Sequence, residues 1–252
     1  MGDFDGKTAI ITGGTRGIGL AIAEEIGRRG ARVCVTARKP EELEAAVEKL
    51  GGPDRAMASR GSADDEDHQQ ETVQAVLDRW GSVDILVNNA AVNPHFGPMI
   101  EAPLSTIRKV MEVNVVSPVS WAQKCWEAWM RDHGGAILNI ASVGGVRTGP
   151  FLGAYNASKA ALIHITKQLG GEMGPKVRVN AVAPAVVKTY FARALYEGHE
   201  EESSRAYPMK RLGEPEDIGK LGAFLLSDDA SWITGECVVI DGGVTTMGGA
   251  GG

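Results

Sequence analysis

The sequence predicts an α/β protein in which a doubly wound sheet of seven parallel strands is covered by helices on both faces. Three observations predict this fold. Short runs rich in valine and isoleucine recur along the 252 residues, helix-like segments separate these runs, and most of the runs are apolar almost throughout. Strands of that kind are buried on both faces, as in a parallel sheet between two helical layers.

The expected elements alternate along the chain. In the amino-terminal part, KTAIIT (7–12) precedes the helix-like IGLAIAEEIGRRG (18–30), and ARVCVT (31–36) precedes PEELEAAVEKLG (40–51). The next four strands are RAMAS (55–59), VDILVNN (83–89), GAILNIAS (135–142) and KVRVNAVAP (176–184). The last helix and the last strand are EDIGKLGAFLLSD (216–228) and ECVVID (236–241). No proline- or serine-rich linker and no repeat divides the series, so we expect residues 1–252 to form one domain, with 244–252 as a flexible tail.

Composition excludes several classes of protein. The first residues, MGDFDGKTAIITGG, do not have the pattern of an export signal, and no apolar run reaches 18 residues, so neither export nor membrane insertion is expected. Cys34, Cys125 and Cys237 lie far apart, which indicates buried thiols in a reducing compartment and therefore a cytoplasmic protein. A net charge of −6 argues against a nucleic-acid surface, and the five histidines have no metal-ligand spacing.

The loop after the first strand, TGGTRGIG (12–19), is the first chemical signal. Gly13, Gly17 and Gly19 stand where a strand turns into a helix, and residues without a β-carbon allow a ligand to approach the backbone. The amino terminus of the following helix offers free N–H groups to a pyrophosphate. The alternative is a tight strand-to-helix turn with no ligand.

The end of the second strand indicates which cofactor is bound. A carboxylate usually holds the ribose hydroxyls of NAD(H) at this point, whereas the 2′-phosphate of NADP(H) requires positive charge. This chain has Ala37 and Arg38 there, and Arg16 and Lys39 can add positive charge. We therefore expect NADP(H). The alternative is that Arg38 binds no cofactor and only packs its aliphatic part against the end of the strand, with its charged group in solvent.

The stretch AYNASKAAL (154–162) places Tyr155 and Lys159 one helical turn apart on the same face. Taken alone, such a pair is an ordinary helix surface. With the glycine loop and Arg38 it becomes a candidate proton donor with a charged neighbour.

Together these motifs resemble the short-chain dehydrogenase/reductase family. The resemblance runs from Lys7 to Gly243, and its motifs are TGGTRGIG, NNAA (88–91), VN (113–114), ASVGG from Ala141, YNASK (155–159), APAVVKT (183–189), GEPEDIG (213–219) and ITGECVVIDGG. The chain is most similar to 3-oxoacyl-[acyl-carrier-protein] reductases and NADPH-dependent carbonyl reductases. The resemblance implies a Rossmann fold with a mobile lid at about 188–211.

The resemblance also implies the roles of four catalytic residues. Tyr155 is the general acid/base, and the Lys159 ammonium, together with the positive charge of the oxidised nicotinamide, lowers the pKa of that phenol. Lys159 also bonds the nicotinamide ribose. Ser142 holds the carbonyl oxygen of the substrate, and Asn114 helps hold a water in the proton relay. The residues implied to bind the cofactor are Gly13, Thr15, Arg16, Gly17, Ile18, Gly19, Arg38, Lys39, Asn89, Ala90, Ala91, Tyr155, Lys159, Pro184, Ala185, Val187 and Thr189.

Two residues depart from the family pattern. Ala91 and Ala185 stand where the family usually has glycine. If the backbone there required a positive φ, an alanine would cost about 1 kcal/mol. The two alanines can also narrow the substrate pocket, or have no measurable effect.

The substrate side is expected to be apolar. The lid holds Tyr190, Phe191, Leu195, Tyr196, Tyr207 and Met209, and the substrate candidates are His95, Phe96, Val143, Phe151, Leu152, Phe191 and Leu195. Alternatively these side chains pack the lid against the body. An acyl carrier protein needs a basic rim, for which Arg131, Lys176 and Arg193 are the candidates; a coenzyme-A-linked or free ketone stays open.

The sequence thus predicts an NADPH-dependent ketone reductase acting on a 3-oxoacyl thioester. The alternatives are a general carbonyl reductase, a biosynthetic secondary-alcohol dehydrogenase acting on a free small molecule, and a non-catalytic NADP-sensing protein. A homotetramer is expected through the helices that carry Asn114 and Tyr155, where SWAQKCWEAWM (120–130) has three tryptophans.

Overall fold

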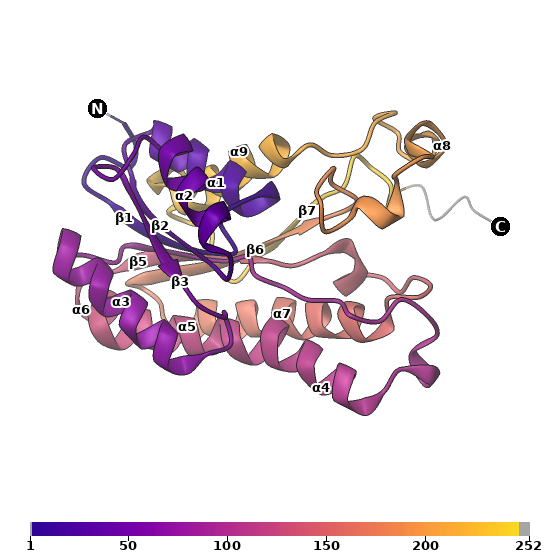
Figure 1. The fold of residues 1–252 in the computed structure, drawn as a ribbon, viewed down its shortest axis with the longest axis horizontal. Helices are drawn as coiled ribbons and strands as arrows, with labels where there is room; N and C mark the ends of the chain where they lie inside the picture. Colours follow the sequence, from indigo (N-terminus) through magenta and orange to yellow (C-terminus); the bar gives the residue numbers. More distant parts are fainter. Residues whose placement is uncertain (1, 247–252) are drawn as a thin grey trace.

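Seven parallel strands form one sheet in the computed structural model, which describes residues 2–246 (Figure 1). The strands are β1 (Thr8–Thr12), β2 (Arg32–Ala37), β3 (Ala56–Arg60), β4 (Ile85–Asn88), β5 (Gly135–Ile140), β6 (Val177–Pro184) and β7 (Cys237–Ile240). Their order in the sheet is β3-β2-β1-β4-β5-β6-β7, and every neighbouring pair is parallel. The predicted doubly wound sheet is confirmed, with strand ends within two residues of the expected ones.

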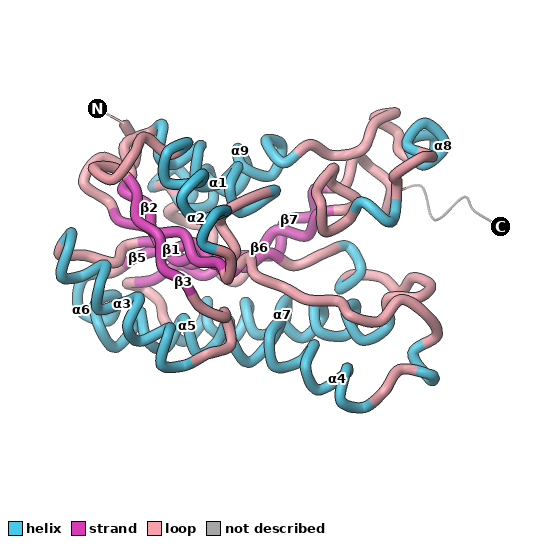
Figure 2. The backbone as a smooth tube through the Cα atoms, viewed as in Figure 1, coloured by secondary structure: helices cyan, strands magenta, loops and turns pink. Residues whose placement is uncertain are grey.

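Helices cover both faces of the sheet (Figure 1, Figure 2). On one face lie α1 (Gly17–Arg28), α2 (Pro40–Lys49) and α9 (Pro215–Leu226). On the other lie α3 (Glu66–Trp80), α4 (Leu104–Met111), α5 (Ser117–Cys125), α6 (Arg131–His133) and α7 (Gly153–Glu172). The expected lid contains a short 3-10 turn, η5 (Arg193–Leu195), and α8 (Glu200–Arg205), which lies at the end of the molecule near β7 (Figure 1).

The strand order reverses between β1 and β4. From β1 the chain builds outward to β2 and β3, and then returns to β4 on the other side of β1. Crevices at the carboxyl ends of strands beside such a reversal are where open α/β sheets bind ligands. The glycine loop that follows Thr12 and the loop that follows Asn88 both lie there.

Two apolar layers hold the helices against the sheet. One cluster joins β1, β2 and β5 to α1 and α9, and includes Ile11, Ile22 and Leu138. The other joins the opposite faces of the strands to α3 and α5. Trp121 is only 1% exposed within this second cluster, and Trp126 and Trp129 pack against it. Trp121 therefore stabilises the core of the monomer, whereas Trp126 and Trp129 are only half-buried by it, so the predicted interface on this helix stays a prediction.

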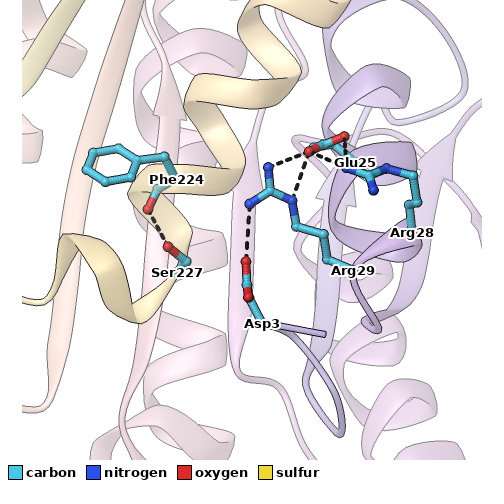
Figure 3. Close-up of polar contacts among 6 residues, drawn as sticks. All are labelled: Asp3, Glu25, Arg28, Arg29, Phe224 and Ser227. Carbon is cyan, nitrogen blue, oxygen red and sulfur yellow. Dashed lines mark hydrogen bonds and ion pairs between the residues drawn. The ribbon is translucent and has the colours of Figure 1, made fainter. Parts of the chain in front are cut away.

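The amino-terminal turn is tied to α1 by an ion-pair cluster (Figure 3). Glu25 accepts hydrogen bonds from Arg28 and Arg29, and Arg29 also reaches Asp3 at 3.3 Å. Partial burial opposes ionisation of Glu25, but the two arginines outweigh it and lower the pKa of that carboxyl. In the same view, the Ser227 hydroxyl donates to the Phe224 carbonyl at 2.9 Å, where α9 ends (Figure 3).

Within residues 2–246, no helix combines the length and the apolar character needed to cross a membrane. The same residues hold no cluster of three or more histidine, cysteine, aspartate or glutamate side chains arranged for a metal ion. Residues 244–246 of the expected tail form a turn, and 247–252 lie outside the described residues.

Candidate active site

Ser142 and Tyr155 meet at the carboxyl end of β5. Ser142 follows this strand by two residues, and its Oγ accepts the Gly144 N–H at 3.1 Å, which caps the 3-10 turn η4 (Val143–Gly145). Tyr155 lies in the first turn of α7 and is half-buried. The Ser142 side chain lies close enough to the Tyr155 hydroxyl to oppose the rise of its pKa, so the two hydroxyl groups are neighbours at the mouth of the sheet.

Lys159 lies one turn further along α7 and is only 2% exposed. Its Nζ donates to the Ile140 carbonyl at 2.7 Å and lies 5.5 Å from the centre of the Tyr155 ring. Burial lowers the pKa of this amine to about 7, because the charged form loses its hydration. Lys159 is therefore poised between its charged and neutral forms at neutral pH.

The protein alone does not lower the pKa of Tyr155. Burial raises the pKa of Tyr155 to about 12, against the opposing effect of the hydrogen bond from Ser142. In the protein alone, Lys159 does not offset this rise, because Nζ bonds the Ile140 carbonyl and the amine itself is partly neutral. The expected lowering also depends on the charge of the oxidised nicotinamide and stays a prediction. At neutral pH the phenol therefore holds its proton.

Asn114 is fully buried on a π-helical turn, η2 (Glu112–Val116), between α4 and α5. Its Oδ1 accepts the Val92 N–H at 2.9 Å, and its Nδ2 donates to the Val92 carbonyl and to Ser158 Oγ, both at 3.0 Å. The Ser158 hydroxyl donates in turn to the Tyr155 carbonyl at 2.7 Å. Asn114 thus joins the loop after β4 to the first turn of α7, and only its Oδ1 keeps capacity for a water. Sequence reasoning missed Ser158, whose only signal is its place between Tyr155 and Lys159.

The glycine loop needs its glycines for two different reasons. Gly13 and Gly17 have φ values of +62° and +55°, a left-handed conformation that favours glycine. Gly19 has ordinary backbone angles, but a β-carbon there would lie 2.5 Å from Asn89 Nδ2. That amide donates to the carbonyls of Thr12 and Gly13, both at 2.9 Å, so it fixes the loop against the end of β4.

The loop fits a dinucleotide cofactor. Asp65 caps the amino terminus of α3, whereas no side chain caps α1 in the described chain, so the first N–H groups of α1 are available to a pyrophosphate. Ile18 packs its side chain into the core beside this terminus. Thr12 Oγ1 accepts the N–H groups of Asn89 and Ala90, which places these two residues against the same loop.

Positive charge gathers at the carboxyl ends of β2 and β3. Arg38 and Lys39 follow β2, and Arg60, the last residue of β3, donates through Nε to the Arg38 carbonyl at 3.3 Å. Arg16 Nη1 and Lys39 Nζ both bond Glu42 Oε1, at 2.9 Å and 3.0 Å. Sequence reasoning missed Arg60 and Glu42. Arg60 could have been found, because a strand that pairs with β2 ends beside Arg38. Glu42 could not, because it is an ordinary acidic residue in the first turn of a helix.

The remaining cofactor candidates follow β6. Pro184 ends that strand, and Ala185 donates its N–H to the Ile240 carbonyl at 3.2 Å. Val187 is buried, and Thr189 covers the glycine loop, where a β-carbon on Gly17 would lie 3.1 Å from Thr189 Cγ2.

The two alanine departures carry no backbone strain. Among the described non-glycine residues, only Phe151 and Lys210 have a positive φ, so Ala91 and Ala185 lie in ordinary conformations. The glycines usual in the family are therefore not required here by the backbone angles.

The substrate candidates form an apolar rim. Phe191 of the lid packs on Tyr155 with ring centres 5.9 Å apart, and Phe96 packs on Phe151 at 5.4 Å. Leu152 pairs with Gly97 in a β-bridge, and His95 Nε2 contacts the Pro98 carbonyl at 3.2 Å. Val143 begins η4, and Leu195 is half-buried in η5.

Phe151 has a left-handed backbone with φ +62°, which is strained for a bulky side chain. Its carbonyl accepts the Gly97 N–H at 3.0 Å, so the strained residue joins the two rim loops.

Two of the three candidates for a basic rim are at the wrong end of the sheet. Lys176 directly precedes β6, and its Nζ donates to the Arg131 carbonyl at 2.9 Å beside the start of β5. Both residues therefore lie at the amino-terminal edge, opposite Ser142 and Tyr155. Arg193 is on the lid, where it pairs with Glu197 and lies over the Tyr190 ring.

A cavity of about 250 Å³ lies behind the lid, between residues 185–187, 207–213 and 240–242. None of the four catalytic candidates lines it, so we do not assign the reaction to this cavity.

Comparisons with known proteins identify the family of this chain. A family model described as "Enoyl-(Acyl carrier protein) reductase" matches residues 13–245. The chain is 39% identical to "Dehydrogenase/reductase SDR family member 4" of Sus scrofa, over 96% of this chain and 88% of that protein. It is 36% identical to "Tropinone reductase-like 3" of Erythroxylum coca, over 95% and 93% of the two chains. The solved structure of a "Short-chain dehydrogenase/reductase SDR:Glucose/ribitol dehydrogenase" from Brucella melitensis superposes with a TM-score of 0.91 at 30% identity, covering 96% of this chain and 98% of that one.

Proposed function

This chain belongs to the short-chain dehydrogenase/reductase family, an oxidoreductase family that uses a nicotinamide cofactor, and on that premise we propose that it reduces a ketone to a secondary alcohol with NADPH. The observation that carries the proposal is the meeting of the Ser142 and Tyr155 hydroxyls at the carboxyl end of β5, with Lys159 buried behind them. Two hydroxyl donors directed at one oxygen stabilise the charge that develops there during reduction.

Tyr155 supplies the proton in this proposal. The raised pKa of Tyr155 means that the phenol is protonated at neutral pH, as a general acid must be. Ser142 donates to the substrate oxygen and has its own position fixed by the bond from the Gly144 N–H. In this proposal Lys159 bonds the nicotinamide ribose, and its positive charge stabilises the phenolate that forms when Tyr155 gives up its proton. When bound, the cofactor supplies the hydride.

We propose NADP(H) rather than NAD(H) from the charges at the end of β2. Arg38, Lys39 and Arg60 surround this point, and the chain has no carboxylate at 37 or 38, where the acid that holds ribose hydroxyls is usual. Arg16 approaches from the glycine loop. The 2′-phosphate of NADP(H) is the cofactor group that such a set of cations would hold.

The substrate is proposed to be an uncharged, apolar ketone. Phe96, Phe151 and Phe191 are each at least half exposed at the rim, and they offer apolar contact area beside Tyr155. The names of the similar proteins include the words dehydrogenase and reductase, which agrees with carbonyl chemistry.

A 3-oxoacyl thioester is the second candidate. Its support is that Met99, Ile100 and Leu104, which follow Phe96 in the sequence, expose apolar side chains on which an acyl chain would pack. A carrier protein is a weaker proposal than coenzyme A, because Arg131 and Lys176 lie at the opposite edge of the sheet.

A substrate screen with a Tyr155→Phe variant tests the proposal. The decrease of NADPH absorbance is followed with free ketones and with 3-oxoacyl thioesters of coenzyme A and of a carrier protein. The variant should bind NADPH as the wild type does, measured by fluorescence titration, yet lose at least about a hundredfold in turnover. Substantial turnover in Tyr155→Phe would refute the role of Tyr155, and normal NADPH binding without turnover of any carbonyl by the wild type would favour a cofactor-sensing protein.

A further inference from the structure

The carboxylate of Glu42 lies where three groups expected to bind the cofactor converge. Glu42 belongs to the first turn of α2. Its Oε1 accepts from Arg16 Nη1 at 2.9 Å and from Lys39 Nζ at 3.0 Å, and its Oε2 accepts from the Thr15 hydroxyl at 3.4 Å. The protein therefore carries its own anion at the point where we propose that the cofactor phosphate binds.

We propose that Glu42 competes with the cofactor's 2′-phosphate and thereby limits how strongly the protein prefers NADPH to NADH. This inference rests on the proposed function in one respect, namely that Arg16 and Lys39 face the cofactor at the end of β2. It assigns a role in cofactor selectivity to a residue on the helix that follows the strand, not at the strand end where the selecting acid usually lies.

The local charges support competition. Of the four cationic side chains gathered here, Arg16 and Lys39 are paired with Glu42, whereas Arg38 and Arg60 have no ion-pair partner among residues 2–246. A phosphate that binds must either take Arg16 and Lys39 from Glu42 or stay beside a like charge. NADH can bind without displacing Arg16 and Lys39 from Glu42, because its neutral ribose hydroxyl can donate a hydrogen bond to the same carboxylate.

Glu42 keeps its charge under ordinary conditions. A hydrogen bond from Lys39, together with the positive charges of Arg16 and Lys39, holds the pKa of this carboxyl below its usual value despite slight burial. The competition therefore persists through the neutral range of pH.

The same contacts allow an opposite role, in which Glu42 merely holds Arg16 and Lys39 in place for the phosphate. The two roles differ in sign. A competitor weakens phosphate binding, so that its removal strengthens it; a positioning residue strengthens phosphate binding, so that its removal weakens it.

The test compares Glu42→Gln with Glu41→Gln. Glu41 is the neighbouring exposed acid in the same first turn of α2 and has no ion-pair partner among the described residues, so the control variant removes an equal charge without freeing Arg16 or Lys39. Isothermal titration calorimetry gives the dissociation constants of 2′,5′-ADP, 5′-ADP, NADPH and NADH for each protein, and thermal melting checks that each variant is folded.

Glu42→Gln should bind 2′,5′-ADP and NADPH about tenfold more tightly, with 5′-ADP and NADH unchanged or weaker, as expected for removal of one nearby like charge. Glu41→Gln should change these constants less than about twofold, and the gain in Glu42→Gln should shrink as salt is added. Unchanged or weaker binding of 2′,5′-ADP by Glu42→Gln, or an equal gain in Glu41→Gln, would overturn the proposal.

The outcome for the wild type separates this inference from the proposed function. If the wild type binds NADPH no better than NADH, the proposed choice of cofactor fails, whereas a gain for 2′,5′-ADP in Glu42→Gln still supports competition. If Glu42→Gln does not fold, Glu42→Asp replaces it. That variant keeps the charge but shortens the side chain, so the competitor role predicts tighter 2′,5′-ADP binding and a positioning role predicts weaker binding.

Discussion

The Lys159 amine is buried and forms no ion pair with a carboxylate of residues 2–246. In the described part of the chain its hydrogen-bond partner is the Ile140 carbonyl, and burial lowers the pKa of Lys159 to about 7. In the unfolded chain a lysine titrates near 10.4. Folding therefore expels a proton from this amine at any pH between these two values.

This proton release predicts how stability depends on pH. Between pH 7 and about 10 the unfolded chain binds more protons than the folded chain, so Lys159 makes the free energy of unfolding rise with pH in that range. Below pH 7 the buried Lys159 lowers the free energy of unfolding by its full amount. Relative to Lys159→Met, the wild type should gain on the order of 1–2 kcal/mol between pH 7 and pH 9. Urea unfolding of both proteins at the two pH values measures the difference, and parallel pH dependence would contradict it.

Single residues were predictable from the sequence where spacing fixes their geometry. Tyr155 and Lys159 had to share a helix face, and Ser142 had to follow a strand, so their positions could be predicted. Glu42 and Arg60 could not, because their importance comes from which side chains they meet across separate elements. The lowered pKa of Tyr155 stays a prediction, because it depends on the charge of the oxidised nicotinamide as well as on Lys159; in the protein alone, burial raises that pKa and Lys159 Nζ bonds the Ile140 carbonyl.

At the scale of elements, α1 and α9 cross at very short distance. A β-carbon on Gly219 would lie 2.8 Å from the Ala21 carbonyl oxygen, and one on Gly222 would lie 3.2 Å from Ile22 Cγ1. These glycines allow two helices to touch through their backbones. The contact supports the helix whose amino terminus faces the cofactor site.

Replacement of Gly219 by alanine should therefore destabilise the fold. We expect a loss of about 1–3 kcal/mol in the free energy of unfolding, because the backbone of Ala21 cannot move aside freely. Gly171 in α7 is the matched control: a β-carbon there meets no atom within 4 Å, so Gly171→Ala should be neutral or stabilise by up to about 1 kcal/mol. Thermal and urea unfolding compare the two variants, and equal stabilities would refute the close-contact explanation.

The sequence predicted which segments form helices and strands and in what order, but not the local irregularities of the helices. The strands follow from apolar runs that must be buried on both faces. The π-helical turn that carries Asn114 could not be expected, because its residues have no distinct composition. The prediction that Lys176 belongs to a basic rim at the active site was wrong and could have been avoided. A residue that directly precedes a parallel strand lies at the amino-terminal edge of the sheet, away from the active site.

For the molecule as a whole, β7 forms one of the two edges of the sheet. Among residues 2–246 this strand pairs only with β6, and Trp232, five residues before it, is 98% exposed. Exposed strand edges and large apolar side chains are usually covered by a partner. We propose that the chain is a cytoplasmic homotetramer, with β7 and Trp232 at one of its interfaces.

Light scattering after size exclusion tests this assembly. The wild type should have four times the mass of the chain, and Trp232→Glu should shift the population toward smaller species, because a charge at the interface would lose its hydration. Circular dichroism checks that the variant stays folded. A wild type of monomeric mass would rule out the assembly.

Arg16 contacts two parts of the molecule that serve different ligands. Its guanidinium bonds Glu42 beside the cofactor site, and its central carbon lies 4.9 Å above the Tyr190 ring of the lid. A ligand that draws Arg16 away from either contact changes the free energy of the other. The two binding events are then thermodynamically linked, and the linkage must be reciprocal: whatever factor the cofactor imposes on substrate affinity, the substrate imposes on cofactor affinity. The affinity for each ligand would then depend on whether the other is bound, through one arginine outside the catalytic group.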